Sequence, residues 1–85
     1  LDPALKLAEE AIAIDPDDLQ AWLIRAEAQQ GLSRFPEARQ AYERTLELAP
    51  NHPSALLGLA TLDLQDGDLE AAKERIDLTV KLAPN

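Results

Sequence analysis

The chain has 85 residues, enough for one small domain, and its hydrophobic residues are mainly alanine and leucine. A net charge of −8 argues against binding to nucleic acid or to anionic membranes, because both need clustered lysine and arginine. The absence of cysteine excludes disulfides and thiolate metal sites, and no apolar run approaches the ~20 residues of a membrane span.

Alanine, leucine, glutamate, glutamine, lysine and arginine dominate the composition, and these residues favour helices, so an all-α fold is expected. Apolar residues recur at helical spacing in five stretches, each with one apolar stripe. In chain order, the predicted helices cover residues 1–14, Asp18 to about Gly31, Phe35–Ala49, Pro53–Gln65 and Leu69–Ala83.

Prolines and short polar residues mark the breaks between these helices. Pro50 cannot continue a helix, whereas Pro53 suits the first turn of the next one. Gly67 can adopt a positive φ in the turn before the last helix. At the matching turn of the preceding unit, Gly31 or the residue at the place of Gly67 is expected to end the helix. The residues expected to cap helix starts are Asp17, Asp18 and Asn51.

The sequence repeats with a period of 34 residues. Pro16, Pro50 and Pro84 are separated by this interval, and the segment 48–51 recurs as 82–85. Ala4, Ala38 and Ala72 keep the same phase, as do other positions of the same helices. A fixed period of this length predicts an array of stacked helical hairpins.

The period and the residues at fixed places resemble the tetratricopeptide repeat family. That family has a large residue early in its first helix, small residues where its two helices cross, a large residue in its second helix and a terminal proline. The resemblance implies a right-handed superhelical stack of antiparallel helix pairs, with five helices in this chain. It divides the chain into a truncated preceding repeat (1–18) and two repeats (19–52 and 53–85). The matching residues are Trp22, Ala26, Ala38, Tyr42 and Pro50, then Ala60, Gly67, Ala72, Ile76 and Pro84.

Two positions depart from the family pattern. Arg25 stands where a buried leucine is usual, so its charge should reach solvent or meet Glu9 or Glu10 of the preceding helix. Leu56 replaces an aromatic residue but stays apolar. Trp22 is expected to be largely buried, and the first helix should cover it with Ala4, Leu7, Ala8 and Ala11.

No residue pattern predicts catalysis, and no cofactor or metal is expected. His52, the only histidine, lies in a turn where a solvated side chain is expected, and neither Ser33 nor Ser54 has an assignable base. Asp63, Asp66 and Asp68 lack the spacing of a calcium loop, so they are interpreted as solvated residues or helix caps.

The resemblance places the first helix of each repeat on the concave face of the stack. The residues carried onto that face include no lysine or arginine, and several are apolar. Such a groove suits a helix or an extended apolar peptide of a partner, although some of its leucines could instead pack between helices. The candidate groove residues are Gln20, Leu23, Ile24, Glu27, Gln30 and Gly31, with Ser54, Leu57, Gly58, Thr61, Leu64 and Gln65.

The expected function is therefore a non-catalytic scaffold for protein–protein interaction. The alternative is a structural spacer within a longer superhelix, of the kind found in bacterial envelope, secretion or polysaccharide-export assemblies; the compartment stays open between cytoplasm and periplasm. The chain begins without methionine and is interpreted as an excised or processed segment. Its uncapped ends should favour self-association, with Ile76, Leu78, Val80 and Leu82 as the apolar surface of the last helix.

Overall fold

The computed structural model describes residues 2–82, and all regular secondary structure in that range is helical. The five predicted helices are confirmed, and most of their ends lie within a residue or two of the expected positions. The predicted end of the last helix at Ala83 lies outside the described residues. The helices are α1 (Pro3–Ile14), α2 (Leu19–Gly31), α3 (Phe35–Leu48), α4 (Pro53–Gln65) and α5 (Leu69–Leu82).

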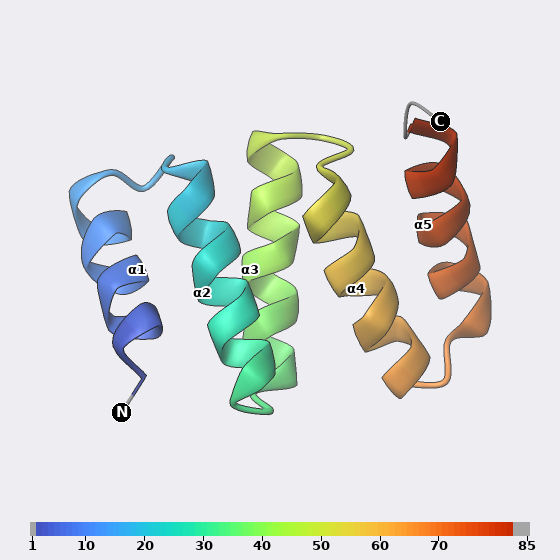
Figure 1. Ribbon diagram of the computed structural model, residues 1–85, viewed down its shortest axis with the longest axis horizontal. Coiled ribbons are helices and arrows are strands. Elements are labelled where there is room, and N and C mark those ends of the chain that lie inside the picture. Colours follow the sequence, from blue (N-terminus) through green and yellow to red (C-terminus); the bar gives the residue numbers. More distant parts are fainter. Residues whose placement is uncertain (1, 83–85) are drawn as a thin grey trace.

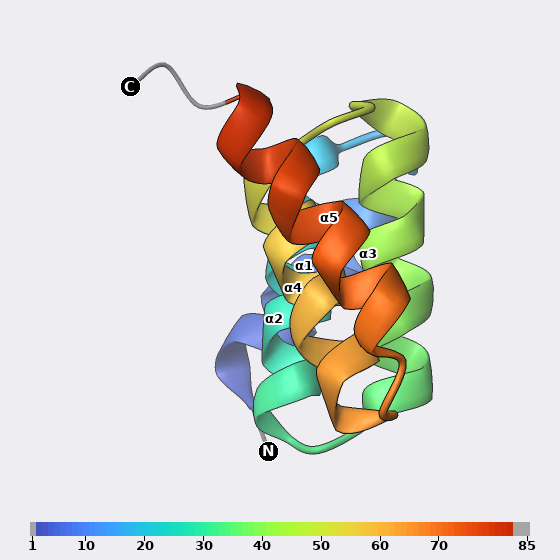
Figure 2. The ribbon, with the colours of Figure 1, turned by 90° about the vertical axis from the view of Figure 1, so that its right-hand side faces the viewer.

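Consecutive helices run side by side in alternating directions along the molecule (Figure 1). The most extensive packing joins α2 to α3 and α4 to α5, and α1 packs on α2 as α3 packs on α4. Viewed from the end of the array, α3 lies in a layer apart from α2 and α4 (Figure 2). This arrangement confirms a solenoid of antiparallel helix pairs, while the repeat boundaries and the right-handed superhelix stay predictions.

Aspartates cap the starts of three helices. Asp2 accepts hydrogen bonds from Ala4 N (2.9 Å) and Leu5 N (3.2 Å), and the Asp18 carboxylate accepts one from Ala21 N. Asp68 caps α5 by accepting a bond from Ala71 N at 3.1 Å. These bonds satisfy backbone N–H groups that have no partner within their own helix.

Two predicted caps were wrong. Asn51 adopts a positive φ of 70° in the turn after Pro50, a conformation that asparagine tolerates, and His52 takes the N-cap position without a side-chain bond. Asp17 instead accepts a hydrogen bond from the Arg44 Nη2 group of α3 at 2.9 Å. Both side chains therefore shape the turns between repeats rather than the helix starts.

The turns within the two repeats share one backbone conformation. Gly67 has a φ of 80°, as expected, and Ser33 at the matching place has a φ of 61°. Gly31 is the last residue of α2, so the serine adopts the left-handed conformation that ends the turn. A side chain in this region costs about 1 kcal/mol relative to glycine, so Ser33 stores local strain.

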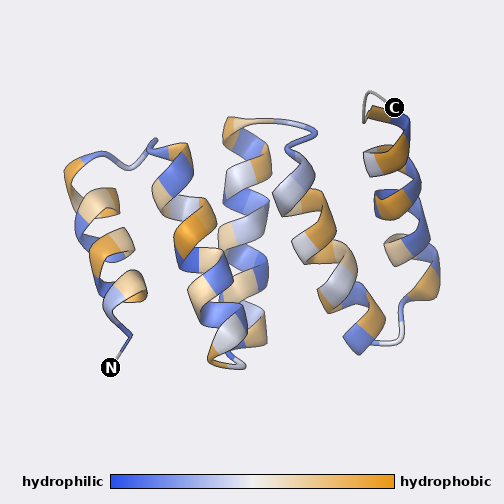
Figure 3. Cartoon of the chain, viewed as in Figure 1, coloured by the Kyte–Doolittle hydropathy of each residue, from blue (hydrophilic) through white to orange (hydrophobic). Residues whose placement is uncertain are grey.

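The core lies between α2, α3 and α4 and is built largely from alanine. All four alanines expected at the helix crossings are buried: Ala26, Ala38, Ala60 and Ala72. Small side chains let the helix axes approach closely, and the two largest packed residues, Tyr42 and Leu59, fill the space that remains. Each helix alternates hydrophobic and hydrophilic positions along its ribbon, as amphipathic helices require (Figure 3).

The surroundings of Trp22 differ from the prediction. Its ring is only partly buried against the core, and its Nε1–H donates to the Pro16 carbonyl at 2.7 Å. The guanidinium groups of Arg25 and Arg44 lie 5.3 and 6.0 Å from the ring centroid. Cationic side chains thus cover the edge of the ring that α1 was expected to bury.

Arg25 follows one of its two predicted courses. Its side chain is partly exposed, and its Nη2 lies 4.0 Å from the Glu9 Oε2 of α1. Leu56 is buried, which confirms that its position stays apolar without an aromatic ring.

Candidate functional site

The surface of α2 and α4 carries most of the predicted groove residues. Leu57 and Leu64 are 47% and 50% exposed, and Ile24 is exposed on α2. A gap of seven residues places Leu57 and Leu64 on one side of α4, two turns apart. The polar members that also lie exposed are Gln20, Glu27, Ser54, Thr61 and Gln65, together with Gly31.

Three predicted groove residues belong to the packing instead. Leu23 is only 6% exposed and sits in the core cluster. Gly58 is half-buried against the ring of Tyr42, and Gln30 accepts a hydrogen bond from the Tyr42 hydroxyl at 2.6 Å. Successive helical residues are turned by about 100°, so Leu23 and Ile24 cannot share a face: one is buried and the other exposed.

Glu27 is the one charged member of the predicted groove set. Burial, together with the negative charge of Glu27, raises the pKa of Tyr42 to about 12. The Tyr42 hydroxyl therefore stays protonated over the physiological range and acts as the donor to Gln30. This contact links α3 to α2 beneath the exposed surface.

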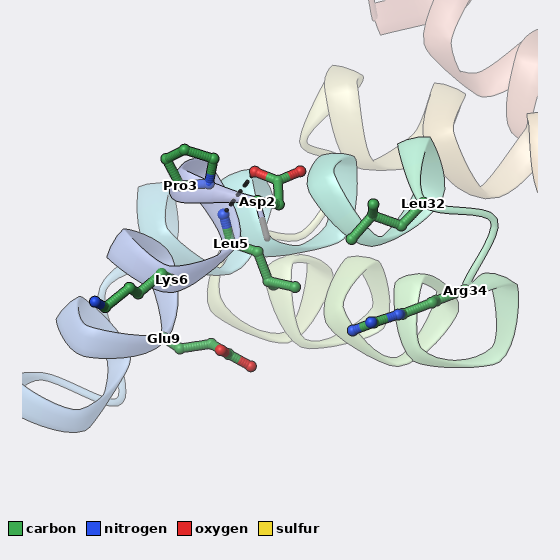
Figure 4. Close-up of a pocket in the computed structure, with 7 residues that line it drawn as sticks. All are labelled: Asp2, Pro3, Leu5, Lys6, Glu9, Leu32 and Arg34. Atoms are coloured by element: carbon green, nitrogen blue, oxygen red, sulfur yellow. Dashed lines mark hydrogen bonds between the residues drawn. The ribbon is translucent and has the colours of Figure 1, made fainter.

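The largest hollow, about 900 Å³, lies away from the predicted groove, where the start of α1 meets the turn between α2 and α3. Figure 4 shows Leu5, Leu32, Glu9 and Arg34 directed toward this space, while Lys6 points away from it. The hollow is wide and open, and the carboxylate of Asp2 is already engaged in capping α1.

A matching hollow of about 400 Å³ lies one repeat later, between α3 and α4. Leu5 and Leu32 are replaced there by Arg39 and Asp66, whose Nη2 and Oδ2 atoms are 3.0 Å apart. Ionic contacts therefore span the second junction, whereas the first is lined by leucine. No nucleophile, base or cluster of ligands converges on either hollow.

Asp63 was wrongly interpreted as a solvated residue. Its side chain is only 4% exposed and accepts hydrogen bonds from Arg39 Nη1 at 3.0 Å and Arg75 Nε at 2.8 Å. The two arginines come from α3 and α5, so Asp63 of α4 ties three helices together. Asp66 and Asp68 are exposed, as expected.

The Arg39–Asp63–Arg75 cluster is structural. Desolvation lowers the pKa of Arg39, but hydrogen bonds and attraction from Asp63 and Asp66 outweigh this and raise it. Both oxygens of the Asp63 carboxylate are occupied by guanidinium groups, which leaves no lone pair aimed at a substrate. Sequence reasoning missed the cluster because its members are 24 and 12 residues apart; the one available signal was the phase of Asp63 with Gln29, which is also buried.

The serine and histidine side chains make no catalytic arrangement in residues 2–82. His52 is half-buried at the N-cap of α4, and its Nδ1 makes no hydrogen bond within that range. Ser54 is exposed in the first turn of α4. Across the same range, no three histidine or acidic residues come together as metal ligands, and no helix has the length and apolarity to cross a membrane.

Comparison with known proteins gives a match over residues 29–85 to the family described as tetratricopeptide repeat. The mouse protein O-mannosyl-transferase TMTC1 is 35% identical over 75 residues, which are 88% of this chain and 8% of that protein. The CTR9 homologue of Arabidopsis thaliana is 30% identical over 86 aligned positions, covering all of this chain and 8% of that protein. A Fusarium oxysporum protein named as a tetratricopeptide repeat and J domain-containing co-chaperone, DNJ1, is 36% identical over 78 residues, 92% of this chain and 15% of that protein.

These relatives are much longer than the chain, which spans 8–15% of their lengths. They come from a mammal, a plant and a fungus, and they give no support to the predicted bacterial envelope or secretion role. What they share with this chain is the repeat segment itself.

Proposed function

Because this chain belongs to the tetratricopeptide repeat family, we propose that it is a non-catalytic protein-interaction module that holds a partner peptide or helix on the surface of α2 and α4. Such repeats generally bind other proteins. The observation that carries the proposal is the exposure of Ile24, Leu57 and Leu64 on these two helices, although the core has claimed their neighbour Leu23.

The chemistry of this surface describes the partner. The exposed leucines suit apolar side chains spaced by one or two helical turns. Glu27 and the net charge of −8 favour a partner with lysine or arginine beside its apolar residues, since complementary charge raises the association rate. The partner is therefore a basic amphipathic peptide, helical or extended.

The test is selection of binders from a displayed library of such peptides, followed by titration calorimetry of the selected peptides. We expect Leu57→Glu and Leu64→Glu to weaken binding roughly tenfold or more, because each would place a carboxylate against an apolar partner. Val80→Glu on α5 is the matched control, since Val80 is also exposed but lies on the last helix. Equal binding by all three variants would refute this surface as the site.

The alternative function is a structural spacer in a longer stack. It is favoured by the apolar residues exposed on the outermost helices, Leu7 and Ile14 on α1 and Val80 on α5, where further helices would pack. A spacer would yield no peptide whose binding depends on Leu57 or Leu64.

A further inference from the structure

The outer face of α1 exposes an apolar stripe of regular composition. Ala4, Leu7, Ala11 and Ile14 follow each other at spacings of three, four and three residues, which places them on one side of the helix. Leu7 is 66% exposed and Ile14 is 86% exposed. The stripe therefore alternates small and large residues and contains no charge.

Beside this stripe lies a hollow of about 390 Å³ between α1 and α2. Alanines make up most of its wall, and Leu7 and Ile24 flank them; its lining residues are Ala4, Leu7, Ala8, Ala11, Asp18, Gln20, Ala21 and Ile24. Ala8 occupies the place that Tyr42 takes one repeat later. The tyrosine ring reaches the next helix there, but alanine is too short to do so here.

Comparison between repeats shows how this face is normally covered. The α3 residues that match Ala4, Leu7, Ala8 and Ala11 are Ala38, Ala41, Tyr42 and Thr45, and all four are buried. The helix packed most extensively on α3 is α2, which runs antiparallel to it. Within residues 2–82, α1 has no helix on the corresponding side.

We propose that a second copy of this chain covers the stripe, with the two α1 helices packed antiparallel about a two-fold axis. In that register Leu7 lies opposite Ala11 of the other copy, and Ile14 lies opposite Ala4. Each large side chain thus meets an alanine and enters the alanine-lined hollow beside it. A two-fold interface needs a surface that complements itself, and this alternation provides it.

The other end of the array is less suited to the same contact. On α5 the corresponding stripe holds Leu69, Ile76 and Val80, all exposed, but also Lys73. Packing a helix there would desolvate an ammonium group, which is costly without a partner. The predicted self-association of the ends is thereby assigned to α1 rather than to the last helix.

Charge acts against this pairing. Each copy carries a net charge of −8, so two copies repel each other at low ionic strength. Because the stripe itself is uncharged, added salt screens the repulsion and leaves the apolar contact intact. The dimer should therefore strengthen with salt, unlike an association held by ion pairs.

The experiment is sedimentation velocity on the 85-residue chain from about 10 µM to about 1 mM, at low and high salt, since an interface of two short helices is small. Dimer formation is expected to increase with concentration and salt. Leu7→Glu and Ile14→Glu should raise the dissociation constant roughly tenfold or more, because each places a carboxylate in an apolar contact. Val80→Glu, at a side chain 69% exposed on α5, should leave it unchanged.

Cross-linking tests the register. The chain has no cysteine, so introduced thiols have no natural competitor. Mixing a Leu7→Cys chain with an Ala11→Cys chain should give a disulfide-linked heterodimer, whereas Leu7→Cys mixed with Val80→Cys should not. A monomer at every concentration, or a dimer lost with Val80→Glu and kept with Leu7→Glu, would overturn the proposal. Neither measurement involves a peptide partner, so the proposed peptide-binding function stands or falls separately.

Discussion

Replacing Gly58 with alanine tests the tightest contact between repeats. In an ordinary helix this change stabilises by about 0.8–1.0 kcal/mol, because glycine is a poor helix former. A β-carbon at position 58, however, would lie 2.5 Å from Cε1 and 2.7 Å from Cε2 of Tyr42. Carbon atoms in favourable contact are about 3.5–4.0 Å apart, so the ring or the helix would have to move by about 1 Å.

Tyr42 has little room to move. Its side chain is buried, and its hydroxyl is hydrogen-bonded to Gln30. Overpacking of this kind costs roughly 1–3 kcal/mol, and tilting the ring would also lose a hydrogen bond worth about 0.5–1.5 kcal/mol. Set against the gain in helix propensity, Gly58→Ala should lower the free energy of unfolding by roughly 1–2 kcal/mol.

Gly31→Ala is the matched control. Gly31 is the last residue of α2, and nothing lies within 4 Å of a β-carbon built there. This change should leave stability unchanged or raise it by up to about 1 kcal/mol. Urea denaturation followed by circular dichroism should show opposite shifts of midpoint for the two variants, with similar slopes.

The chain contains its own compensating pair. Ala8 and Ile24 stand at the places of Tyr42 and Gly58 one repeat earlier, with the large and small residues exchanged. The double variant Tyr42→Ala/Gly58→Ile should therefore be more stable than the sum of its single changes predicts. A rise in midpoint for Gly58→Ala equal to that of Gly31→Ala would refute the close contact.

Three further predictions concern charge, pH and backbone strain. Changing both Arg39 and Arg75 to leucine should cost about 3–5 kcal/mol, because it leaves the buried Asp63 carboxylate unpaired, and adding Asp63→Asn should restore part of the loss; an equal loss in the triple variant, measured by urea denaturation, would contradict this. Tyr42, the only tyrosine, should ionise near pH 12 in the folded chain and near pH 10 in urea by absorbance titration. Because the folded pKa is raised, its contribution to stability is complete below about pH 10 and is lost as pH rises toward 12, and Tyr42→Phe should lack this component. Ser33→Gly should raise the free energy of unfolding by about 0.5–1 kcal/mol by relieving the positive φ, whereas Gly67→Ala should lower it by about 1 kcal/mol, and thermal melts of the two variants give the comparison.

The sequence alone determined the helices, their turns and the small residues at their crossings. The period of 34 residues and the helical spacing of apolar positions are local patterns, so they can be followed along the chain without knowing which helices touch. Ala26, Ala38, Ala60 and Ala72 were placed correctly for this reason.

The tertiary structure decided which side of each helix its neighbours cover. Leu23 and Ile24 are both apolar, and only the packing of α2 on α3 shows that the first is buried and the second exposed. Asp63 looked like a solvated turn residue until α3 and α5 brought Arg39 and Arg75 to it. Such contacts join residues far apart along the chain, and their energies depend on distance and burial in space, which spacing along a sequence does not contain.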